Sequence, residues 1–369
     1  MKLFKSLLVA PATLGLLAPL SATANELNLN DVSGYSSSEE IQNINEFNPA
    51  EELAVTNSRV DGLEARFNNF EAGGFSETTT ASFGVDMLVG AVDGASSEVA
   101  TFDYQMGIGL ETSFTGEDSL SATIDIGNAS SVAGGADGLN FDSTGDKLML
   151  DGLTYTFPVG GATVMVGDNT DISGVYSGAC AYSAFTDYMG NCGTGNSVGV
   201  GGNGATAAMS YAFDSGFTLA GGISSTPTSI LTEEGADTFG IEAAYSGDSY
   251  SVAVAYADAE TTTYWGINGT YAFDFATLSA GLESADADGS DTATGFMDGL
   301  SFPEVGAGSL DIGMGTTGNF ASSDPEYYIY EASYAYPLND GMTITPGVFV
   351  KETGGDEMTG IAVKTSFSF

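Results

Sequence analysis

The residues of this chain that could do chemistry are almost all carboxylates. Aspartate and glutamate together number 49, lysine and arginine together 7, and histidine is absent. Without histidine the chain offers no Ser-His-Asp triad and no histidine-ligated metal centre. Two cysteines without histidine also make a poor zinc site. The composition therefore predicts no catalytic residues, no metal site and no cofactor.

The charge excludes one class of partner. The formal net charge is -42, so the phosphates of a nucleic acid would be repelled. The 22 phenylalanines and 17 tyrosines, with acids interspersed between apolar residues, argue against a disordered acidic chain. We therefore expect a folded protein that does not bind nucleic acid.

The first residues indicate export. Lys2 and Lys5 precede an apolar stretch over residues 7–20, and small residues at 22–24 form a cleavage pattern, which together predict a signal peptide over residues 1–24. A retained membrane anchor is the alternative, but the stretch is short and contains two prolines. In an exported chain, Cys180 and Cys192 are predicted to form a disulfide.

A polar leader over residues 25–49 is followed by a heptad pattern over residues 50–72. Leu53, Val60 and Phe67 fall at a positions of this pattern. A short coiled-coil stalk that joins copies is favoured over a single surface helix. Both segments are expected in the periplasm.

Residues 73–369 alternate between apolar and small or acidic residues. In "TFDYQMGIGLETSF", residues 101–114, the odd-numbered residues from 103 to 113 are acidic, small or polar, whereas most of the even-numbered residues are apolar. Such alternation is typical of a β-strand. About sixteen such runs follow one another, each near the ~10 residues of a tilted membrane strand. The pattern predicts an all-β fold, a transmembrane antiparallel β-barrel of about 16 strands. The stretches Met149–Tyr155 and Phe296–Phe302 break the alternation with an acid, so bulges or shifted boundaries are predicted there.

The connections alternate in length, as they do in outer-membrane barrels. Tight turns such as "FPVGG", "FDSG" and "PLNDG" follow aromatic pairs, and the links between them are longer and rich in Gly, Ser, Asp and Thr. The aromatic pairs are expected to form a girdle at the inner membrane interface. The final strand, "GIAVKTSFSF", is expected to pair with the first strand and close the barrel.

Several stretches resemble the porins of cyanobacterial outer membranes. They are "VSGYSSSEEIQNINEF", "RVDGLEARF", "FSETTTASFGVDMLVG" and the terminal Phe369, an ending by which the assembly machinery recognises outer-membrane proteins. The resemblance implies a general diffusion channel, and several members of the family are classed as iron-uptake porins. Members normally carry an S-layer-homology module between leader and coiled coil. The corresponding segment is too short here to hold that module, which argues against attachment to the cell wall.

If the apolar faces of the strands meet lipid, the opposite positions line the channel. The predicted pore-lining residues are Asp86, Asp103, Glu111, Asp125, Glu242, Glu283, Asp311, Glu331, Lys351 and Lys364. Acids in the loops are more simply explained as solvated side chains.

The third external loop, predicted from about Asp168 to Asn203, is the longest. It is expected to fold inward and narrow the pore with Asp168, Asp171 and Asp187, as third loops of porins commonly do, while a loop lying on the surface is the alternative. The segment "DADGSD" at 286–291 lacks the EF-hand spacing and is expected to be a solvated loop.

Together these observations predict a passive, cation-preferring porin, a homotrimer in the outer membrane. Its partners would be the lipid bilayer, small cations and solutes in transit, and the assembly machinery. One alternative is a secreted or surface all-β adhesion or structural protein. Another is an enzyme built on a barrel, whose nucleophile and base, without histidine, would have to be carboxylates alone.

Overall fold

The structure is a computed structural model of the whole chain. It describes residues 78–94, 98–129, 141, 144–187, 189, 204–232, 236–317, 326–354 and 357–369, which belong to the compact unit Asn69–Phe369. The predicted signal peptide, leader and stalk lie outside the described residues. Within the described ranges, no helix has the length and apolar character needed to cross a membrane.

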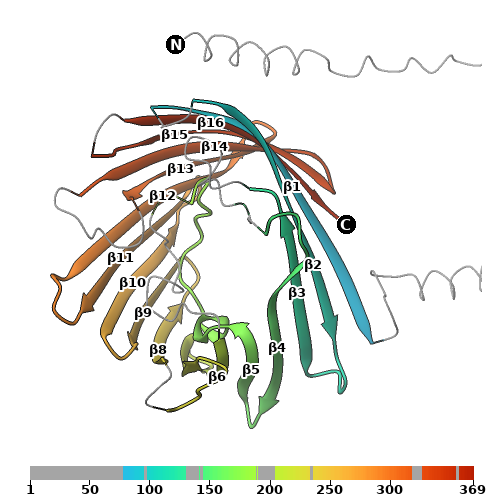
Figure 1. Cartoon of the computed structure of the whole chain (residues 1–369), viewed down its shortest axis with the longest axis vertical. Helices are drawn as coiled ribbons and strands as arrows, with labels where there is room; N and C mark the ends of the chain where they lie inside the picture. Colours follow the sequence, from blue (N-terminus) through green and yellow to red (C-terminus); the bar gives the residue numbers. More distant parts are fainter. Residues whose placement is uncertain are drawn as a thin grey trace, which may run out of the picture. The chain divides into compact units, whose positions relative to one another are not determined.

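Sixteen antiparallel strands form one closed ring, which confirms the predicted barrel (Figure 1). In chain order the strands are β1 Thr79–Asp93, β2 Ala100–Thr112, β3 Ser119–Gly127, β4 Met149–Val159, β5 Ala162–Thr170, β6 Gly204–Ala212, β7 Phe217–Ser225, β8 Asp237–Ser246, β9 Tyr250–Asp258, β10 Thr262–Ala272, β11 Thr277–Ala287, β12 Ala293–Val305, β13 Gly308–Thr316, β14 Tyr328–Asn339, β15 Met342–Lys351 and β16 Met358–Ser368. Each strand pairs with its neighbours in sequence, except that β1 and β16 pair with each other across the closure.

The ring closes between β1 and β16. The register runs from Gly84 opposite Ser368 to Asp93 opposite Thr359. Phe83 and Phe369 extend the contact, because each backbone N–H donates to the other residue's carbonyl oxygen, at 2.9 and 3.1 Å, and their rings stack. The first and last strands therefore leave no open edge, as the final sequence run predicted.

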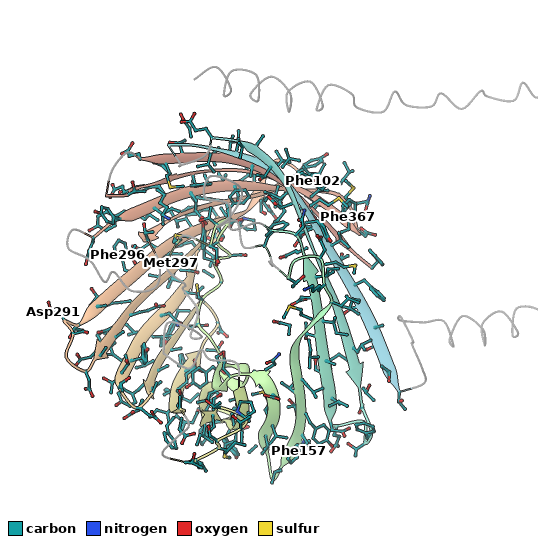
Figure 2. The ribbon with its side chains drawn as sticks, in the orientation of Figure 1. Phe102, Phe157, Asp291, Phe296, Met297 and Phe367 are labelled. Carbon is teal, nitrogen blue, oxygen red and sulfur yellow. The ribbon has the colours of Figure 1, made fainter. Side chains whose placement is uncertain are left out.

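Adjacent side chains on a strand point to opposite faces of the wall, because the strand period is two. In β8, the side chains of Phe239 and Ile241 are exposed on the outside, while that of Glu242, the next residue, is buried inside the barrel. In β12, Phe296 points outward and its neighbour Met297, 2% exposed, points inward (Figure 2). The outer face is apolar along most strands, as lipid contact requires.

One rim of the barrel has tight turns and a row of aromatic rings. β4 and β5 are joined by Gly160 and Gly161, whose φ angles of 57° and 90° suit a two-residue hairpin turn. Ring contacts at this rim include Tyr155 with Phe157, Tyr211 with Phe213, Phe217 with Tyr245, Tyr271 with Phe273, and Phe275 with Phe302. Most of the longer connections lie at the opposite rim, as predicted, but residues 259–261 join β9 and β10 there by a turn as tight as those of the first rim.

The two predicted irregularities have different outcomes. Between β3 and β4 the register shifts from Thr123 opposite Gly152 to Ile124 opposite Leu150, so Asp151 is the extra residue of a bulge. The bulge keeps Leu150 and Leu153 on the outside despite the intervening acid. The bulge predicted within Phe296–Phe302 is wrong, because β12 keeps its register there and shifts only beyond Phe302.

Candidate channel lumen

The connection after β5 turns into the barrel (Figure 1). Residues 171–187, called the inward segment below, run inside the ring of strands (Figure 1). The segment starts with the short 3-10 helix η3 (Ile172–Val175), which is capped by the Asp171 carboxylate, because Ser173 N donates to Asp171 Oδ1 at 2.8 Å. Ile172 and Val175 pack on Met165 of β5 and fix the start of the segment against the wall.

Backbone N–H groups of the inward segment are hydrogen-bonded to side chains on the wall. Ser177 N donates to Glu242 Oε1 of β8 at 2.6 Å, and Ala179 N donates to Asn268 Oδ1 of β10 at 3.1 Å. Tyr182 N donates to Ser279 Oγ of β11 at 3.1 Å. A segment that cannot form a ladder must satisfy its N–H groups in this way.

Glu331 of β14 is the strongest of these anchors. Its carboxylate accepts hydrogen bonds from the Tyr182 hydroxyl at 2.9 Å, Phe185 N at 2.6 Å, Thr186 N at 2.9 Å and Thr186 Oγ1 at 2.7 Å. Glu331 is 3% exposed, so these charge-assisted bonds are shielded from water. Burial first, and the nearby charge of Glu331 second, raise the pKa of Tyr182, which keeps its hydroxyl a donor.

Glycines on the wall make room for the large side chains of the segment. A Cβ atom at Gly299 of β12 or Gly313 of β13 would overlap Tyr182, and one at Gly347 of β15 would overlap the Phe185 ring. The two rings fill these gaps and join a core with Leu88, Met297, Ile329 and Phe349 inside the barrel. The segment is thus held by packing as well as by hydrogen bonds.

The predicted members of the third loop lie in different settings. Asp168 belongs to β5, which extends to Thr170, so its placement in the loop is wrong. Asp171 caps η3, and Asp187 at the far end of the segment is exposed. Cys180 is not a free thiol, but Cys192 lies outside the described residues, so the pairing of the two stays a prediction.

Four predicted pore-lining acids are buried, and three of them lie on the wall from β8 to β14. Glu242, Glu283 and Glu331 face inward on β8, β11 and β14, yet they are 3%, 5% and 3% exposed. Glu242 and Glu331 anchor the inward segment, so their carboxylates are not presented to water in the lumen. Asp311 of β13 and Lys351 of β15 lie on the same wall and are partly exposed.

The wall from β1 to β3 carries four more of the predicted pore-lining acids. Asp86 accepts from Gln105 Nε2 at 3.0 Å, and Glu111 accepts from the Ser119 hydroxyl. Asp103 accepts from Thr101 Oγ1 at 2.8 Å and is 6% exposed. Asp125 lies beside Gly107 of β2, its register partner. We call Asp86, Asp103, Glu111 and Asp125 the acidic wall.

The acids of this wall are staggered along the channel. Asp86 pairs with position 105 of β2 and Asp125 with position 107, so the four acids lie at the levels of residues 103, 105, 107 and 111. At ~3.3 Å per residue the steps between levels are roughly 7, 7 and 13 Å along the strand. Lys364 of β16, whose register partner is Leu88 of β1, is the base next to this wall.

The sequence did not identify two of the wall residues that accept hydrogen bonds from the inward segment. Asn268 and Ser279 are ordinary polar residues at inward positions, and nothing near them in sequence marks them as contacts of residues 89 or 97 positions away. Within the described ranges, no group of three or more potential ligands could hold a metal ion. The described features of the lumen are therefore its inward-facing carboxylates and the inward segment.

The closed barrel of sixteen strands with its inward segment has the fold of the porins. A loop-deletion variant of OmpT, an outer membrane protein of Vibrio cholerae, superposes with a TM-score of 0.57 at 10% identity, over 79% of this chain and 100% of that one. An engineered variant of the Rhodopseudomonas blastica porin gives 0.55 at 17% identity, with the same coverage.

Sequence comparison gives a narrower match. No protein-family model matches the chain. The uncharacterized protein alr4550 of Nostoc sp. is 37% identical over 131 residues, which cover 31% of this chain and 23% of that protein. The match therefore spans less than two thirds of the relative's length.

Proposed function

We propose that this chain is an outer-membrane porin, a passive diffusion channel for small hydrophilic solutes. The observation that carries the proposal is the inward segment fastened across one wall of a closed sixteen-stranded barrel. A barrel of this size holds an aqueous lumen unless something fills it. A segment anchored by buried hydrogen bonds would narrow such a lumen.

The proposal includes a preference for cations. The acidic wall has four carboxylates at level spacings of roughly 7 to 13 Å, which is close to the Debye length of about 8 Å at physiological salt. Their potentials therefore overlap along the path instead of being screened one by one. The apolar wall of the barrel focuses this field into the lumen.

The resemblance to iron-uptake porins extends the proposal to one solute. A negative lumen would admit hydrated ferrous iron together with other small cations, without a coordination site. The same resemblance supports a homotrimer, with the N-terminal segment in the periplasm and Phe369 as the signal for assembly into the outer membrane.

Planar-bilayer recording of the purified chain tests the channel and its selectivity together. We expect stable conductance, and a zero-current potential under a KCl gradient whose sign shows cation preference. The potential should grow as the salt concentration falls, because screening weakens. Absence of conductance in inserted protein would refute the channel. Anion preference, or a potential independent of salt, would refute the electrostatic part alone.

A further inference from the structure

We propose that the outer face of β9 to β14 around Asp298 is the contact surface between copies of this chain and does not face lipid. The inference rests on the proposed membrane channel. Asp298 is exposed on the outside of β12, among the apolar residues Leu278, Leu300 and Ile312. No described residue forms a hydrogen bond or ion pair with its carboxylate.

Asp298 lies well inside the apolar band of the barrel. Phe302, four residues nearer the tight-turn rim, contacts Phe275 in the aromatic row, with ring centroids 6.5 Å apart. Four residues span ~13 Å along a strand and roughly 10 Å across a membrane at the usual strand tilt, while the apolar band is about 25 Å tall. A carboxylate at that depth is unfavourable in contact with acyl chains, which offer it no donor.

The surface around Asp298 is hollowed. Gly269 of β10, Ala280 of β11 and Asp298 are successive register partners, so small outward residues form a row across the strands. Two hollows meet at Asp298, one of about 440 Å³ toward β13 to β15 and one of about 600 Å³ toward β9 and β10. Such depressions accept side chains from a facing surface.

The same face carries donors that lack partners. Tyr256, Trp265 and Tyr330 point outward, are 43 to 45% exposed, and make no hydrogen bond to any described residue. In a cyclic assembly each contact joins two different parts of the surface, so the Asp298 carboxylate of one copy can accept from the hydroxyl and indole donors of the next copy. No outward-facing lysine or arginine is present on the described strands, so the contact would use hydroxyl and indole donors.

The single tryptophan of the chain provides the test. Trp265 stands on this face, so its fluorescence in bilayers that contain brominated lipid reports whether acyl chains touch it. The control is the double variant Trp265→Phe, Phe102→Trp, which moves the indole to the outside of β2. β2 lies eight strands away around the ring, and Phe102 is 56% exposed.

We expect the quenching slope of Trp265 to be at least about threefold lower than that of the tryptophan at position 102, because a protein contact excludes lipid. Equal and strong quenching of both would overturn the contact surface while leaving the membrane channel intact. If neither tryptophan were quenched, the barrel would not be in the bilayer, and both proposals would fail.

Two further measurements, the mass of the solubilised particle and the effect of filling the hollow, test whether a second copy of this chain covers the face around Asp298. The detergent-solubilised protein should have a multiple of the chain's mass, and a monomer with shielded Trp265 would overturn the proposal. Ala280→Trp fills the hollow and should lower the temperature at which oligomers dissociate on a semi-native gel. Ala122→Trp, the matched change on the outside of β3, should not. Equal behaviour of the two variants would contradict the assignment.

Discussion

Replacing Glu331 by glutamine should loosen the inward segment while leaving the barrel intact. The carboxylate accepts four hydrogen bonds, two on each oxygen. Glutamine keeps one acceptor oxygen and puts an NH₂ group in place of the other. A hydroxyl of Tyr182 or Thr186 can rotate to accept from that group, but the backbone N–H of Phe185 or Thr186 cannot. One buried N–H therefore loses its partner.

The cost follows from that count. A buried donor without a partner costs about 1–3 kcal/mol, which is roughly a 5- to 150-fold increase in the population of the detached segment. The ladder of the barrel is unaffected, because Glu331 meets the segment through its side chain. The effect should therefore appear as local opening rather than global unfolding.

Two measurements check this prediction. Single-channel recordings of Glu331→Gln should show larger or fluctuating openings, and chymotrypsin should cleave after Tyr182 or Phe185 faster by the factor above, since cleavage tracks the open population. Glu111→Gln is the control, because it removes a carboxylate from the acidic wall without touching the segment. If the two variants gave the same recordings and the same cleavage rates, Glu331 would not be an anchor.

Three further predictions concern the lumen, the rim and the cysteines. Joint replacement of Asp103 and Asp125 by asparagine and of Glu111 by glutamine should lower the zero-current potential without abolishing conductance, whereas an unchanged potential would exclude the acidic wall as its source. Asp118, in the turn between β2 and β3, accepts from Tyr155 and from Thr115, and these bonds hold its pKa below the usual 3.8. The stabilising effect of the Asp118 carboxylate is present above pH 3.8 and is lost as pH falls through the lowered pKa. The Asp118→Asn variant should therefore melt at a lower temperature than the unmodified protein at pH 7, and the difference between the two melting temperatures should narrow in strong acid. A difference that is constant with pH would contradict this account. Alkylation of denatured, unreduced protein should modify neither Cys180 nor Cys192, and quantitative modification of both would rule out the disulfide.

The barrel was predictable because its rules act locally. Alternation with a period of two fixes which side chains face outward from the barrel, and the lengths of most turns identify the two rims. Even the bulge at Asp151 could be anticipated, since an acid interrupted an apolar face. The same argument predicted a bulge at Asp298, where the strand is regular. An acid in the apolar face of a strand can mean a bulge, but it can also mean that this face contacts something other than lipid.

The arrangement of the lumen was less predictable. Parity places Glu242 and Glu331 inside the barrel, but it does not show that a segment 65 to 146 residues away in sequence covers them. The glycines that receive Tyr182 and Phe185 also look like ordinary strand glycines, because their role depends on a ring supplied by a distant loop. Contacts of this kind leave no periodic signal in the sequence.

The closure of the ring also constrains how the protein can fold. Gly84 meets Ser368 across the seam, so the contact that completes the barrel joins nearly the two extremes of the described chain. Contacts between residues so far apart form slowly, because a long loop must be closed before they are made. Until β16 arrives, both β1 and the latest strand to form present unpaired edges that could join another chain. Folding should therefore be limited by the seam, and any factor that shields strand edges would have its greatest effect before that step.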